Sequence, residues 1–86
     1  MPRYFFNTVD GRRYPDEDGA ELPDLEAVHR KATLVVAELL KEQPAKFWED
    51  RRLRVEVTDE AGAEVIAIEV SLTDGEGRNR GDQGRA

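Results

Sequence analysis

The chain has 86 residues and no cysteine, and its 19 acidic and 13 basic side chains give a formal net charge of −6. The absence of cysteine excludes disulfides, thiol catalysis and cysteine-based zinc sites, and the acidic balance argues against nucleic acid as a partner, because phosphate binders need a concentrated basic face. A chain this short forms one domain with a small core, and association with a second chain is a common way to gain further burial.

The first residues, MPRYFFN, are aromatic but do not form an export signal, which needs a charged region followed by seven or more apolar residues. No apolar run in the chain approaches the roughly 18 residues of a membrane span. We therefore expect a cytoplasmic protein without a membrane partner.

A β-hairpin is predicted at the start of the chain. Residues 3–9 are aromatic and β-rich, and the following pair Asp10-Gly11 is typical of a two-residue type I′ turn. The returning strand, 12–14, ends at Pro15, which lacks the amide hydrogen that a sheet ladder needs. Alternation makes the first strand apolar on both faces, and it leaves open which face meets a helix.

A helix is predicted after an acidic loop at 16–26. Asp24 can accept hydrogen bonds from the free amides of the first turn, and Pro44 disfavours helical geometry at the residue before it. Between them, apolar side chains recur every three or four residues and predict one buried stripe. The stripe consists of Leu25, Val28, Ala32, Val35, Val36, Leu39 and Leu40.

A second hairpin is predicted after a connection at 44–51. Residues 52–58 alternate apolar and polar side chains, Asp59 to Gly62 supply a turn, and residues 65–72 form the strongest strand of the chain. Residues 74–86 contain no apolar side chain except the terminal alanine, so we expect a disordered tail.

The pattern predicts an α+β fold of the order β-β-α-β-β. We expect two layers, a four-stranded and mainly antiparallel sheet with one amphipathic helix on one face, in a single domain at 1–73. The order of the strands in the sheet stays open.

Catalytic, metal-binding and cofactor-binding motifs are not recognisable. If Gly19 takes the glycine position of an EF-hand loop, Tyr14 and Leu25 occupy its essential first and last ligand positions. The single histidine, His29, and the single serine, Ser71, have no partners of the kind that a zinc site or a nucleophilic triad requires. We therefore expect no enzyme activity, metal, cofactor or identifiable small-molecule ligand.

The candidate interaction surface consists of Phe47, Trp48 and whichever face of the first strand the helix leaves uncovered, because protein interfaces are enriched in exposed aromatic residues. The candidates are Tyr4, Phe5, Phe6, Val9, Phe47 and Trp48. A helix covers only one face of the first strand, so the other face would be free. Phe47 and Trp48 have an alternative role, closing the bottom of the core.

Several motifs in order resemble a family of small proteobacterial proteins catalogued as a domain of unknown function. They are the opening MPRYFF, the Asp10-Gly11 turn, the stretch 16–27 with ELPDLEA, and VTDEAG at 57–62. The resemblance covers residues 1–72 and implies a bacterial origin without an activity or ligand. The acidic hairpin before a helix is also similar in topology to the N-terminal part of HicB-type antitoxins.

The leading hypothesis is a non-enzymatic protein-interaction module that forms a homodimer by burying the open sheet face or by pairing edge strands. An alternative is an antitoxin-like or regulatory inhibitor whose acidic loop meets a basic protein. A third hypothesis is a minor enzyme that uses carboxylates of that loop.

Overall fold

The computed structural model describes residues 1–75, so the tail expected at 74–86 lies, from residue 76 on, outside the described residues. The elements in chain order are β1 (Arg3–Val9), β2 (Arg13–Tyr14), β3 (Ala20–Glu21), α1 (Leu25–Glu42), α2 (Pro44–Asp50), β4 (Arg52–Thr58) and β5 (Glu64–Ser71).

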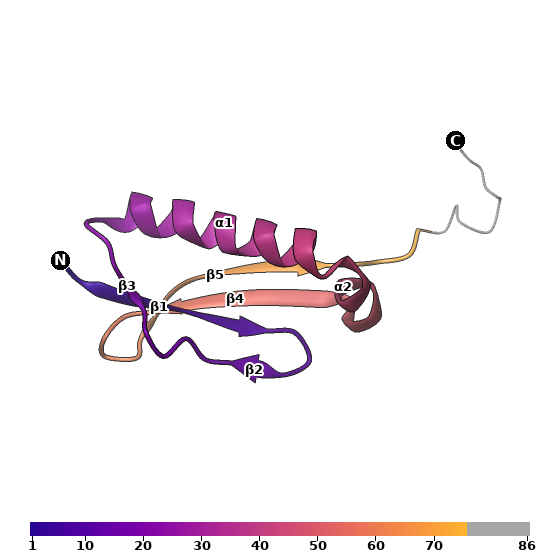
Figure 1. Cartoon of the computed structure of the whole chain (residues 1–86), viewed down its shortest axis with the longest axis horizontal. Coiled ribbons are helices and arrows are strands. Elements are labelled where there is room, and N and C mark those ends of the chain that lie inside the picture. The colour runs from indigo at the N-terminus through magenta and orange to yellow at the C-terminus, as the bar shows by residue number, and fades with distance from the viewer. Residues whose placement is uncertain (76–86) are drawn as a thin grey trace.

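The fold consists of an antiparallel sheet with α1 along one face (Figure 1). The strand order is β2-β1-β4-β5. Strand β3 lies on the same edge of β1 as β2, but it pairs with the start of β1, whereas β2 pairs with its end. This confirms the α+β fold with its two layers. The structure adds two elements to the prediction, the two-residue strand β3 within the acidic loop and the helix α2.

Helix α1 begins and ends where its capping residues predict. The Asp24 carboxylate accepts a 2.9 Å hydrogen bond from the Ala27 amide, and the Gln43 amide donates to the carbonyl of Leu39 at 3.0 Å. The buried stripe begins at Val28, because Leu25 at the first helical position is 50% exposed.

The core lies between α1 and the sheet. Its buried apolar members are Tyr4, Phe6, Val28, Ala32, Val36, Leu53, Val55 and Val57. The register pairs Phe6 with Val57, and Val57 with Ile66, so these side chains share the helix-facing side of the sheet. The face of β1 that carries Tyr4 and Phe6 is therefore the one that α1 covers.

The first turn differs from the prediction. Val9 pairs with Arg13, so the connection has three residues, 10–12, instead of the two of a type I′ turn. Gly11 has a φ of 93°, which shows that the glycine is needed, and the Asp10 amide donates to the Arg12 carbonyl. The turn from Asp59 to Gly62 is as predicted, with Gly62 at a φ of 86°.

Helix α2 lies in the segment at 44–51, which the sequence predicts only as a connection. Pro44 does end α1, but it also stands in the first turn of α2, where its missing amide hydrogen costs nothing and its fixed φ suits a helix. Arg51 ends α2 in the left-handed region, at a φ of 66°, and its amide donates to the Phe47 carbonyl at 2.7 Å.

Candidate interaction site

The residues predicted to form one interaction surface lie in three different places. Tyr4 and Phe6 are 9% and 7% exposed and belong to the core, so they cannot meet a partner without unfolding. Phe47 is half-buried against the core, while Trp48 is 61% exposed on the same short helix. Of the two alternatives for α2, Phe47 takes the core role and Trp48 stays at the surface.

The other face of β1 is covered by the chain itself. The acidic loop folds back over β1, and a Cβ atom at Gly19 would lie 2.8 Å from the Phe5 ring. Asn7 is 5% exposed. Its side-chain Nδ2 donates to the Glu56 carbonyl, and its side-chain Oδ1 accepts from the backbone amide of Asp16 at 2.9 Å. Phe5 and Val9 are half-buried, so the expectation of a free apolar face on β1 is wrong.

Asp16 holds this loop in place. Its Oδ2 accepts from the Phe6 amide at 3.1 Å, and its Oδ1 accepts from the amides of Asp18 and Gly19, both at 3.1 Å. The carboxylate thus occupies the part of the β1 edge between the β2 and β3 pairings. Burial raises the pKa of Asp16, but the hydrogen bonds from Gly19, Phe6 and Asp18 and the charge of Lys31 together bring it below its ordinary value.

Replacing Gly19 with alanine is expected to destabilise the fold more than the same change at Gly62. Both residues have positive φ, at 72° and 86°, so both variants carry a similar backbone penalty of about 1–2 kcal/mol. A Cβ atom at Gly62 has open space, whereas one at Gly19 meets the Phe5 ring. Urea unfolding of the two variants measures the difference, and equal losses would contradict the close packing of the loop on Phe5.

The remainder of the open sheet face is a network of ion pairs. Glu56 accepts from Arg13 at 2.7 Å and from Arg54 at 2.8 Å, and Arg54 also reaches Glu64 and Glu69. The side-chain hydrogen bonds from Arg54 and Arg13 lower the pKa of Glu56. A partner would have to displace or desolvate these paired charges, so this face is a poor candidate for burial.

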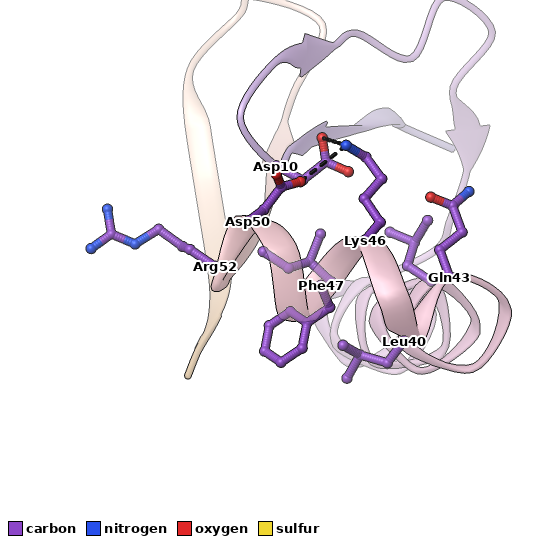
Figure 2. Close-up of a pocket in the computed structure, with 9 residues that line it drawn as sticks. Asp10, Leu40, Gln43, Lys46, Phe47, Asp50 and Arg52 are labelled. Carbon is purple, nitrogen blue, oxygen red and sulfur yellow. Dashed lines mark hydrogen bonds and ion pairs between the residues drawn. The ribbon is translucent and has the colours of Figure 1, made fainter. Parts of the chain in front are cut away.

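A small pocket opens between α2, the end of α1 and the first turn (Figure 2). The Lys46 ammonium stands there between two carboxylates, 3.0 Å from Asp50 and 3.9 Å from Asp10. The hydrogen bond to Asp50 raises the pKa of Lys46, which favours the charged ammonium that pairs with both carboxylates. The cluster ties α2 to the hairpin.

Metal-binding clusters of three or more histidine or carboxylate side chains do not occur within residues 1–75. Both His29 and Ser71 are exposed there. None of the helices in this part of the chain is long and apolar enough to cross a membrane.

The outer edge of β5 is a candidate site that the sequence did not indicate. Within the described residues β5 pairs only with β4, so one side of its backbone has no ladder partner. The Leu72 amide donates to the Arg51 carbonyl. Leu72 and Arg51 form the next pair of the β4–β5 ladder after Ser71 and Arg52. Because hydrogen-bonded pairs alternate along an antiparallel ladder, the residues two, four and six positions before Leu72, which are Val70, Ile68 and Ile66, also direct their backbone groups to β4.

The residues between them direct their backbone groups outward. These residues are Ala67, Glu69 and Ser71. The pairing of β1 with β4 leads to the same assignment. The Phe6 amide donates to Asp16 and so points away from β4. Val57, which pairs with Phe6, therefore directs its own backbone groups away from β1 and toward β5.

The side chains of β5 also suit pairing. The strand reads EVIAIEVS and contains neither proline nor lysine, the residues that most often protect an edge. The helix-facing side chains Ile66, Ile68 and Val70 are only half-buried, although they pack on the core. The two carboxylates, Glu64 and Glu69, are paired with arginines of β4. The helix-facing side of this edge is thus apolar, and the charges of its two carboxylates are locally balanced.

The comparison with known families bears on the whole of this fold. A family model, a domain of unknown function (DUF6894), matches residues 3–71, from the start of β1 to the end of β5. The chain belongs to this family. No curated protein and no solved structure matches the chain. The family covers both hairpins, α1 and the β5 edge, and its description assigns no activity to them.

Proposed function

We propose that the chain is a non-enzymatic protein-interaction module that binds a β-strand of a partner along the outer edge of β5. The observation that supports this proposal is the row of outward backbone groups at Ala67, Glu69 and Ser71 on a strand that contains no proline or lysine and whose two carboxylates are paired with arginines of β4. Strand addition uses such groups for affinity and the alternate side chains for specificity.

The other hypotheses have less support. An inhibitor that meets a basic protein through the acidic loop would have only part of its charge available, because Asp16 accepts three backbone hydrogen bonds, one from β1 and two from the loop, and Glu21 is paired with Arg3. An enzyme that uses these carboxylates would need perturbed groups within a pocket, whereas Glu17 and Asp18 are exposed.

A proline at Ala67 tests the proposal, because it removes an outward amide without removing a hydrogen bond to β4. Glu60 offers a matched control: it is the second residue of the Asp59–Gly62 turn, where proline is well tolerated. We expect the tagged wild-type chain and Glu60→Pro to retain a protein partner from the native cell, whether a second copy or another chain, and Ala67→Pro to lose it.

Retention of the same partner by Ala67→Pro would refute binding at the β5 edge, provided that circular dichroism shows both variants folded. The absence of any partner from wild-type chain at natural abundance would refute the interaction module itself.

A further inference from the structure

The geometry points to a second copy of this chain as the occupant of the β5 edge, in a symmetric antiparallel pair of β5 strands. This inference rests on the proposed function and names its partner. A two-fold axis perpendicular to the sheet brings the same edge of both copies together and keeps both α1 helices on the same side of the joined sheet.

The alternation of β5 restricts the register. Side chains directly opposite each other in an antiparallel pair point to the same face of the sheet. The axis must therefore lie midway between the two copies of one residue, so that this residue stands opposite itself. An axis at Glu69 would place two carboxylates opposite each other, which is unfavourable. An axis at Ala67 would pair Glu69 with Val65, where the β4–β5 ladder is interrupted by a register shift.

An axis at Ile68 avoids both problems. On the helix-facing side, Ile68 then meets Ile68 of the second copy, and Ile66 meets Val70. On the open side, Ala67 meets Glu69, whose carboxylate already has Arg52 at 3.0 Å and Arg54 at 3.4 Å in its own chain. The apolar side chains therefore join into one row, and no carboxylate faces another directly.

The backbone groups fit the same register. Ala67 and Glu69 both direct their amide and carbonyl groups outward, so each Ala67–Glu69 pair across the axis exchanges two hydrogen bonds. Ile68 lies between these pairs as a non-hydrogen-bonded pair, the kind in which side chains approach most closely. Half-buried apolar side chains on the helix-facing side gain burial at the same time.

Two substitutions at Ala67 distinguish this register from others in sedimentation experiments on the full chain. We expect the wild type to sediment as a dimer, at twice the 9.7 kDa of one chain. Ala67→Glu places a carboxylate opposite Glu69 at two symmetric positions and should raise the dimer dissociation constant roughly tenfold. Ala67→Lys places an ammonium group there and should leave the constant unchanged or lower it.

An axis at Ala67 would instead place identical charges opposite each other in both variants, so equal weakening by glutamate and lysine would overturn the register. Cysteine substitution gives a second measurement, which is clean because the chain has no cysteine of its own. Under mild oxidation Ile68→Cys should form a covalent dimer and Ala67→Cys should not, since only residue 68 lies next to its own copy. The reverse result would overturn the proposed axis.

A wild-type chain that remains a monomer at high micromolar concentration would overturn the second copy as occupant. Hydrogen exchange then separates the remaining possibilities. Protected amides at Ala67 and Glu69 in that monomer would mean that another segment of the same chain occupies the edge. Rapid exchange, together with an Ala67-dependent partner from the native cell, would mean that a different protein binds there and that the proposed function stands.

Discussion

Replacement of Phe6 by alanine is expected to lower the free energy of unfolding by about 3–5 kcal/mol, most of the stability of a domain this small. The Phe6 side chain is 7% exposed and belongs to the core cluster between β1 and α1. Its ring also has the Lys31 ammonium 5.6 Å from its centroid. The loss therefore combines a cavity in the core with the removal of a cation–π contact.

Urea unfolding at one fixed, low protein concentration measures this effect without a contribution from association. Trp48→Ala is the matched control, because it removes a larger aromatic side chain that is 61% exposed. We expect it to change the free energy of unfolding by less than about 0.5 kcal/mol. A similar loss in both variants would contradict the exposed position of Trp48 in the folded chain.

Replacement of Asp16 by alanine is expected to cost about 2–3 kcal/mol, because a charged acceptor is lost and the Phe6 amide is left without a partner at the β1 edge. The same change releases the amides of Asp18 and Gly19, so the loop over Phe5 should open. Urea unfolding measures the stability loss, and hydrogen exchange at the Phe6 amide reports the opening.

Glu17→Ala is the control for Asp16, since Glu17 is exposed in the same loop. Its effect should stay within about 0.5 kcal/mol. A loss at Glu17 as large as that at Asp16 would indicate that the total charge of the loop matters, not the hydrogen bonds of one carboxylate.

The Asp16 contribution should also depend on pH. The folded state lowers the pKa of Asp16, so the folded chain binds this proton less readily than the unfolded chain does. The stabilisation is then complete above about pH 5 and decreases as the pH falls below the unfolded pKa of about 3.9 toward the lower folded value. The stability difference between wild type and Asp16→Ala should shrink over this acidic range. A difference independent of pH there would contradict the role of the carboxylate.

The candidate site could be predicted only in part, and β1 shows why. Its two apolar faces were visible in the sequence, but a loop of the same chain covers Phe5, and this depends on the geometry of Asp16 and Gly19. Residues 65–72 were recognised as the strongest strand. Their value as a binding edge depends on strand order, which an alternating pattern does not encode.

Local chemistry was sufficient where a residue acts on its immediate neighbours. Asp24 capped α1, Gly62 took the left-handed position of its turn, and alternation assigned Leu53, Val55 and Val57 to the core. Pro44 was ambiguous, because the same rigid ring that ends one helix can begin the next.

By itself, therefore, the sequence determined the α+β class, the limits of α1 and the faces of the long strands, since these follow from capping and periodicity over a few residues. Only the tertiary structure decided that the open face of the sheet is covered by a loop and by ion pairs, and that β5 forms a long edge without a ladder partner among residues 1–75. These properties result from contacts between residues far apart in the chain, such as Phe6 with Asp16 and Arg54 with Glu69, whose pairing depends on how the elements assemble.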